Sequence, residues 1–247
     1  MWKRILLLFF LAALATALLS ANPRRAVPAR GAAEIAQADA NAPINAAPKL
    51  VAFTFDDGPH RGSTDKLLDG LAERGAKGTF FLVGEEIDEG RDLVRRMRDE
   101  GHQIGNHTWS HKRLDELSDE EIIQEIGKTD ALLKSIAGEG EYWLRPPYGF
   151  LREGAEKLVG VPLVKWSVDP RDWESRNTES VVKAVSETIE PGSIVLLHDI
   201  YPTSVEAALR LIDALSAEGY RFVTVEELLR QYGVTPEPGK VYRSATT

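Results

Sequence analysis

Short apolar runs alternate with amphipathic segments along most of the chain. Seven runs have the length of strands, and they cover residues 50–55, 78–83, 103–105, 142–144, 163–168, 193–197 and 221–223. Apolar residues recur between them at helical spacing, as at Leu67, Leu68 and Leu71. Ser118 and Glu121 have the spacing of a helix capping box. A β-α alternation repeated about seven times predicts an α/β domain with a parallel sheet, which we expect to span residues 49–234.

Polar side chains gather at the C-terminal ends of five of these predicted strands. They are Asp56 and Asp57, His107 and His111, Arg145, Asp169 and Asp172, and His198. In a closed barrel of parallel strands these ends meet on one face, where active sites lie. An open doubly wound sheet would gather only the residues near its switch point. The even distribution over five strands therefore favours a closed or nearly closed barrel.

The two ends of the chain differ in composition from the domain. Lys3 and Arg4 precede an apolar segment at residues 5–19, and Ser20 and Ala21 follow it, which is the layout of a signal peptide cleaved near Ala21. An uncleaved membrane anchor is the alternative for residues 1–21, because the apolar segment is nearly long enough to cross a bilayer. Both interpretations predict an extracytoplasmic domain, either secreted or periplasmic, or anchored to the membrane through residues 5–19. We expect residues 22–48 to be a flexible linker and residues 235–247 a loose tail.

The composition narrows the possible chemistry. The net charge of -8 does not favour a nucleic-acid partner, since such proteins usually carry a basic patch. The absence of cysteine excludes disulfides, thiolate nucleophiles and Cys-ligated zinc. Any metal ligands must therefore be His, Asp or Glu. The oligomeric state cannot be inferred from the sequence.

The stretch HTWSH places two imidazoles four residues apart. On a helical turn His107 and His111 would project from one face and could share a metal, although a single pair of this kind is as often a surface pair. Asp57 with these histidines forms a three-ligand set that leaves a position open for water. Zn²⁺ suits these ligands best, and Co²⁺, Ni²⁺ or Mn²⁺ are alternatives. If Asp57 binds the metal, Asp56 can take a proton from the activated water as a general base.

Two further stretches contribute chemistry. RPPYG begins with Arg145, which would orient Asp56 and keep it ionised, or would be a solvated arginine on a surface loop. The apolar run IVLLHD leads directly into His198. An acid near this histidine, such as those of DPRDW, would make it a competent general acid.

Together these stretches resemble a known family. TFDDGP, HTWSH, RPPYG, DPRDW and LLH occur in the order found in the polysaccharide deacetylases of carbohydrate esterase family 4, the NodB-homology domain. The resemblance covers about residues 50–231. It implies a distorted, incomplete (β/α) barrel of about seven parallel strands.

The resemblance also implies a role for each motif residue. Asp56 would be the base, positioned by Arg145, and His198 the acid that protonates the leaving amine. Asp57, His107 and His111 would hold the metal. Further roles fall to the backbone N–H of Tyr148 as oxyanion donor, to Asp172 in tuning His198, and to Trp173 and Leu196 in lining an acetyl pocket. Asp169 could share the role of Asp172. His60 and His102 match no catalytic role and are expected to be structural.

The function implied is that of a metal-dependent hydrolase acting on a glycan. It would remove N-acetyl groups from N-acetylglucosamine units of a chitooligosaccharide or of peptidoglycan. One alternative is an O-acetyl esterase on acetylated xylan, which needs nearly the same machinery. Another is a non-catalytic glycan-binding module, which a full motif set argues against. The sequence does not identify the glycan.

Overall fold

The computed structural model describes residues 49–246, so the predicted signal peptide or anchor at 1–21 and the linker at 22–48 lie outside the described residues. The strands are β1 Lys49–Asp56, β2 Gly78–Leu82, β3 Gln103–Asn106, β4 Leu163–Val164, β5 Ile194–His198, β6 Tyr220–Phe222 and β7 Val241–Tyr242. The α-helices are α1 Thr64–Glu73, α2 Gly84–Ile87, α3 Arg91–Asp99, α4 Asp119–Ala137, α5 Asp172–Ser175, α6 Thr178–Thr188, α7 Pro202–Ala217 and α8 Val225–Gln231. Short 3₁₀ turns are η1 Asp88–Gly90, η2 Leu114–Glu116, η3 Pro147–Gly149 and η4 Ala155–Leu158. No helix within residues 49–246 has the length and apolar character needed to cross a membrane.

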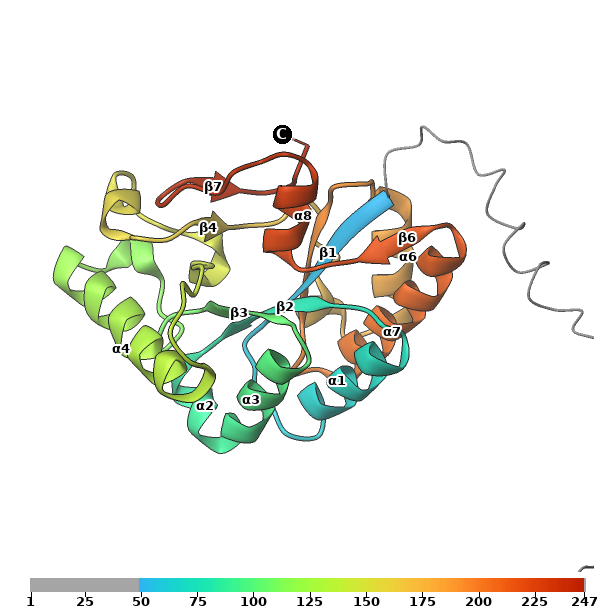
Figure 1. The fold of residues 1–247 in the computed structure, drawn as a ribbon, viewed down its shortest axis with the longest axis horizontal. Coiled ribbons are helices and arrows are strands. Elements are labelled where there is room, and N and C mark those ends of the chain that lie inside the picture. The colour runs from blue at the N-terminus through green and yellow to red at the C-terminus, as the bar shows by residue number, and fades with distance from the viewer. Residues whose placement is uncertain (1–48, 247) are drawn as a thin grey trace, which may run out of the picture. The chain divides into compact units, whose positions relative to one another are not determined.

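The strand β1 lies at the centre of a parallel sheet with the order β3-β2-β1-β5 (Figure 1). Its second half pairs with β2 and β5, and its first half pairs with β6. All of its residues after Lys49 are buried. A strand covered on both faces needs a continuous apolar run, which explains the pattern that made this strand predictable.

Single bridges, rather than long ladders, continue the sheet into a barrel. Leu144 bridges to Asn106 at the end of β3 and to Leu163 in β4, and Val168 bridges back to Val195 in β5. The strands thus follow one another around a ring whose second half is held by few hydrogen bonds. This arrangement confirms the predicted distorted, incomplete (β/α) barrel.

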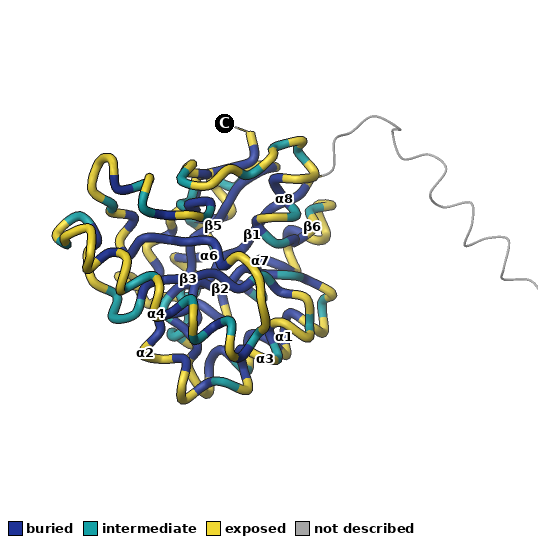
Figure 2. Tube along the Cα trace, turned by 60° about the vertical axis from the view of Figure 1, so that its left-hand side comes forward, coloured by how far each residue is buried: buried dark blue, intermediate teal, exposed yellow. Residues whose placement is uncertain are grey.

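The helices cover the outside of the barrel, and the strands are buried between them (Figures 1 and 2). The predicted stripe of Leu67, Leu68 and Leu71 forms the fully buried face of α1. At the start of α4, Ser118 and Glu121 form the predicted capping box, with both reciprocal hydrogen bonds present. These local signals fix where the helices begin and which face packs inward.

Two expectations about strands are wrong. Residues 142–144 do not form a strand, and only Leu144 makes bridges, because Pro146 and Pro147 have no N–H group with which to extend a ladder. The expected strand at 163–168 is reduced to β4 and a separate bridge at Val168.

The tail is also more ordered than its composition indicates. β7, within the segment 235–247, pairs in parallel with β4, and Tyr242 is only 4% exposed. The Tyr242 hydroxyl accepts a hydrogen bond from the Glu237 N–H and donates one to the Thr235 carbonyl. The prolines and glycine therefore belong to a turn that returns the chain to the barrel, and a two-residue strand is too short to show a period.

Candidate active site

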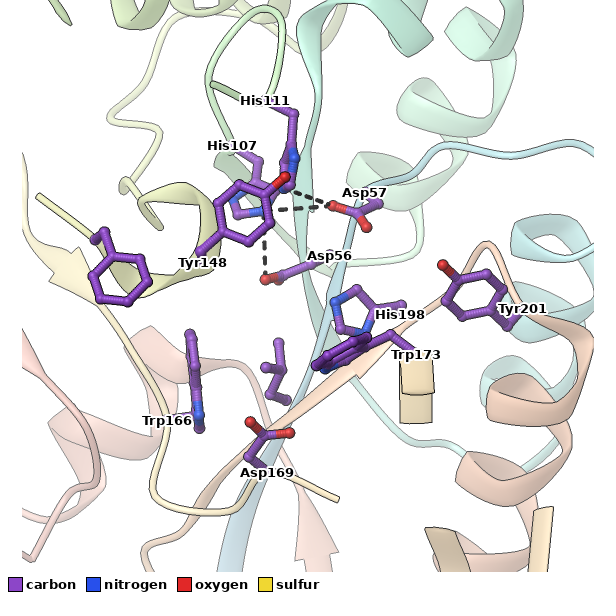
Figure 3. Close-up of a pocket in the computed structure, with 12 residues that line it drawn as sticks. Asp56, Asp57, His107, His111, Tyr148, Trp166, Asp169, Trp173, His198 and Tyr201 are labelled. Carbon is purple, nitrogen blue, oxygen red and sulfur yellow. Dashed lines mark ion pairs between the residues drawn. The ribbon is translucent and has the colours of Figure 1, made fainter. Parts of the chain in front are cut away.

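A cavity of about 540 Å³ opens where the strand ends meet. Eight of the ten predicted site residues line it, and the other two, Arg145 and Asp172, are fully buried behind its wall. Figure 3 shows Asp57, His107 and His111 converging, with Asp56 and His198 beside them and Trp173 next to His198. The structure therefore brings the five motifs to one face of the barrel.

Asp57, His107 and His111 form a compact group. The Asp57 Oδ1 atom lies 3.2 Å from His111 Nε2 and 3.6 Å from His107 Nε2, and the three potential ligand atoms lie within 4.8 Å of one another. Asp57 follows β1 in a left-handed conformation with φ 73°, which turns its side chain out of the strand direction toward the histidines.

The donor set fits a divalent cation. Asp57 Oδ1 is buried and has no hydrogen-bond partner, so it presents an unused acceptor to the centre of the group. The Nδ1–H of His107 donates to the Arg145 carbonyl at 2.6 Å, which leaves the Nε2 lone pair facing Asp57. Burial lowers the pKa of His107 and of His111, and this favours the neutral imidazole that a metal requires.

The geometry of the HTWSH stretch differs from the expected helical turn. Residues 107–111 form a non-helical loop after β3, in which Thr108 and His111 have positive φ angles of 68° and 56°. The two imidazole rings nevertheless lie close together, with 4.9 Å between their centroids. The spacing of four thus brings the histidines together through a tight loop rather than through one face of a helix.

Asp56 is held by a buried arginine. Arg145 is fully buried, which excludes the solvated surface arginine considered above, and its Nη1 atom lies 2.7 Å from Asp56 Oδ1. The same guanidinium donates to the Thr54 hydroxyl and to the carbonyls of Val164 and Lys165. These contacts fix the carboxylate while its other oxygen, Oδ2, faces His107 Nε2 at 3.6 Å.

Asp172 is the partner of His198. Its Oδ1 atom accepts from His198 Nδ1 at 2.8 Å, and its Oδ2 atom accepts from the His198 backbone N–H at 2.8 Å. Asp169 instead accepts from the Arg171 N–H at 2.9 Å. The sequence left open which acid takes this place, and the left-handed conformation of Arg171, with φ 53°, separates the directions of the two acids.

This pairing determines the charge of His198. Burial lowers its pKa, but the hydrogen bond and charge of Asp172, with the charges of Asp56 and Asp57, outweigh burial and raise the pKa to about 9. The imidazole is therefore protonated at neutral pH. His198 pairs in register with Asp56 at the ends of β5 and β1, so a proton donor and a proton acceptor lie on neighbouring strands (Figure 3).

The rim of the cavity is aromatic. Tyr148 and Trp173 are 58% and 44% exposed, whereas Leu196, which also lines the cavity, is only 4% exposed. Tyr148 has a left-handed backbone with φ 58°, and its ring packs against His111 with 4.8 Å between centroids. Three further aromatic residues line the cavity and were missed from the sequence, namely Phe150, Trp166 and Tyr201. All three lie within three residues of a motif, which is the signal that could have identified them.

The remaining histidines lie outside this cavity. His102 accepts a hydrogen bond at Nδ1 from the Gly78 N–H, and burial lowers its pKa to about 4, so it is neutral. His60 contacts the Ser63 hydroxyl at 3.0 Å. Both make local contacts consistent with the expected structural role.

Comparisons with known proteins identify the family. Residues 44–160 match the sequence model of the family described as polysaccharide deacetylase. A peptidoglycan-N-acetylglucosamine deacetylase of Bacillus cereus is 38% identical over 190 residues, which cover 74% of this chain and 89% of that protein. The chain belongs to the polysaccharide deacetylase family.

Other members of the polysaccharide deacetylase family differ in length and in named substrate. The peptidoglycan-N-acetylglucosamine deacetylase PgdA of Listeria monocytogenes is 38% identical over 198 residues, which are 80% of this chain but only 42% of that protein. A chitooligosaccharide deacetylase of Azorhizobium caulinodans is 36% identical and is matched over 91% of its length.

Two solved structures share the polysaccharide deacetylase fold with this chain. A T48 deacetylase solved with substrate has a TM-score of 0.76 at 41% identity, covering 79% of this chain and 96% of that one. A family 4 acetyl xylan esterase from Clostridium thermocellum, solved with a cobalt ion, has a TM-score of 0.76 at 35% identity, covering 81% of this chain and 100% of that one.

Proposed function

We propose that this chain is a metal-dependent hydrolase that removes N-acetyl groups from N-acetylglucosamine units of peptidoglycan or a chitooligosaccharide. One observation carries the proposal: three side chains that could hold a metal ion, Asp57, His107 and His111, lie beside a separately held carboxylate, Asp56, whose neighbour on β5 is the protonated His198. The names of similar proteins, which include deacetylases of both glycans, support the substrate class.

Asp57, His107 and His111 would hold the cation, most suitably Zn²⁺, with Co²⁺, Ni²⁺ or Mn²⁺ as alternatives. When bound, the cation polarises the acetyl carbonyl and makes a nearby water more acidic. The neutral imidazoles and the unpartnered Asp57 oxygen support this assignment. The resemblance to a cobalt-bound acetyl xylan esterase supports a metal-dependent reaction without fixing the physiological ion.

The side chains divide the proton transfers. Asp56 takes a proton from the attacking water, and the Arg145 ion pair keeps it oriented for this step. The water oxygen bonds to the acetyl carbon, and the backbone N–H of Tyr148 would stabilise the oxyanion. His198, oriented by Asp172, gives its proton to the amide nitrogen as the carbon–nitrogen bond breaks. Acetate and a free amine are released.

The acetyl group would lie against the wall formed by Trp173 and Leu196, both of which line the cavity. The exposed aromatic rim gives the sugar rings faces on which to pack. We further propose that the domain acts outside the cytoplasm, secreted or periplasmic, or anchored through residues 5–19. Similar proteins named for peptidoglycan support this localisation.

An O-acetyl esterase is the second candidate, because an acetyl xylan esterase has the same fold at 35% identity. The raised pKa of His198 favours the amide substrate, since an amine leaving group needs a proton more than an alcohol does. The two candidates make different predictions for substrate choice.

Acetate release after Zn²⁺ loading would be measured on chitin oligomers, peptidoglycan and acetylxylan, with and without EDTA. We expect release from one or both N-acetylated glycans, lost in EDTA and restored by Zn²⁺. Release from acetylxylan alone would establish the esterase instead. Glycan binding with no acetate from any substrate would show a non-catalytic binding module.

A further inference from the structure

The loop that carries both histidines has a backbone that needs outside support. This histidine loop, residues 107–111, connects β3 to η2 without helical structure. Thr108 and His111 both adopt the left-handed region, with φ angles of 68° and 56°. Residues other than glycine stay in this region only where surrounding contacts hold them there. The contacts of the loop should therefore show what fixes the histidines.

Two carbonyl groups of the loop accept hydrogen bonds from the start of α2. The carbonyls of Thr108 and Trp109 accept from the N–H groups of Gly84 and Glu85 at the start of α2, at 2.9 and 3.0 Å. The Thr108 N–H donates to the Asn106 side chain at 2.8 Å. Two backbone donors in the middle of the loop, those of Trp109 and Ser110, find no acceptor among these groups.

Glu125, in the second turn of α4, accepts both of these donors. Its Oε2 atom accepts from the Trp109 N–H at 3.0 Å and from the Ser110 N–H at 2.8 Å. Its Oε1 atom accepts from the Ser110 hydroxyl at 2.7 Å. The side chain is 11% exposed, and the nearest cation, Lys112 Nζ, lies 3.8 Å from Oε1. One carboxylate thus holds the centre of the loop by three hydrogen bonds, of the charge-assisted kind that are stronger than neutral ones.

The two histidines depend on this carboxylate to different degrees. His107 has supports of its own, because its N–H donates to the Leu82 carbonyl and its ring donates to the Arg145 carbonyl. His111 follows directly after the residues that Glu125 holds, and its Nε2 atom lies 3.2 Å from Asp57. Its approach to Asp57 is therefore set by the loop.

We propose that Glu125 is a positioning residue for the metal site: its carboxylate holds the histidine loop so that His111 faces Asp57 and His107. This rests on the metal site of the proposed function. Partners that orient metal ligands typically contribute 10- to 100-fold in metal affinity. Removing the Glu125 carboxylate should weaken metal binding by about this factor while leaving the three ligands in the chain.

The test is Zn²⁺ affinity, measured by competition with a chromophoric chelator on the full-length chain. We expect Glu125→Ala to bind Zn²⁺ about 10- to 100-fold more weakly than wild type, and Glu125→Gln, which keeps one acceptor oxygen, to lie between the two. The visible absorption of the Co²⁺-loaded protein should change in Glu125→Ala, since it reports ligand geometry. Glu120→Ala removes a charge from an exposed position in the same helix and should match wild type.

Thermal unfolding in EDTA shows whether each variant is folded before metal is added. Folded Glu125→Ala protein that binds Zn²⁺ within twofold of wild type would overturn the proposal. If Glu125→Ala does not fold, Glu125→Gln decides: an affinity within twofold of wild type overturns the proposal, and a weaker one supports it. Wild-type protein that takes up no Zn²⁺ would overturn the metal site itself, and with it the role of Glu125. None of these outcomes depends on deacetylase activity.

Discussion

Replacing Asp172 by asparagine should lower the pKa of His198. Burial acts on this imidazole to lower its pKa, and the hydrogen bond and charge of Asp172 are the main opposing influences. Without the carboxylate, we expect the pKa to fall from about 9 to 6.5 or below. At pH 8 the protonated fraction would fall from ~90% to ~3%, a loss of about 30-fold in the acid form. Acetate release at this pH should fall at least as much.

The assay is an NMR titration of the His198 ring in metal-free protein, assigned with a His198→Gln variant. Asp169→Asn is the matched control, because Asp169 lines the same cavity but hydrogen-bonds to the Arg171 N–H. Its His198 pKa should remain near 9. An Asp172→Asn protein that keeps a His198 pKa near 9 would refute the assignment of Asp172 as the cause.

The same shift predicts how stability depends on pH. The pKa of His198 is about 9 in the folded protein against an ordinary value of 6.5, so folding favours the protonated form by about 3 kcal/mol. This contribution is fully present below about pH 6.5 and is lost as the pH rises through about 9. The destabilisation caused by Asp172→Asn, measured by urea unfolding in EDTA, should therefore be largest at pH 6 and smallest at pH 10.

Three other substitutions test the remaining roles. Asp56→Asn should lower turnover by about 10²- to 10⁴-fold while Zn²⁺ stays bound, and a variant with a tenth of wild-type activity would remove Asp56 as the base. His107→Ala should lose Zn²⁺ and activity together, whereas stoichiometric tight Zn²⁺ would contradict the ligand set. Arg145→Met leaves the 3% exposed Asp56 without its cation, so the free energy of unfolding in urea should fall by about 3–5 kcal/mol. A fall below 1 kcal/mol would show that the pair is not needed for stability.

The sequence predicted the elements that are long enough to show a hydrophobic period or a capping motif. The continuous apolar run predicts β1, the apolar stripes predict the helices, and the capping box at Ser118 marks the start of α4. β4 and β7 have two residues each, so no period can be seen in them, and their pairing joins segments about 80 residues apart. The prediction that residues 235–247 form a loose tail was wrong, because proline and glycine are as typical of an ordered turn as of a loosely held terminus.

The residues of the site could be predicted from the sequence, but the contacts that position them could not. All ten motif residues lie in or directly behind the cavity, because strand ends of a barrel must meet. Which of Asp169 and Asp172 pairs with His198 depended on the left-handed backbone of Arg171. Nothing in the sequence around Arg171 predicts that conformation. Glu125 was missed because a glutamate on an amphipathic helix is indistinguishable from a solvated one until its partners in the histidine loop are known.

Arg145 has a consequence for attempts to stabilise this protein. It is the largest of the fully buried side chains among residues 49–246, and it also packs on the Phe81 ring, 4.2 Å from the guanidinium carbon to the centroid. Replacing a buried ion pair by apolar residues of similar volume often leaves a protein as stable or more so. A selection for thermal stability alone could therefore replace both Arg145 and Asp56 by apolar residues. The resulting protein would be more stable but would lack the catalytic base Asp56. Engineering of this protein therefore has to screen for turnover as well as for melting temperature.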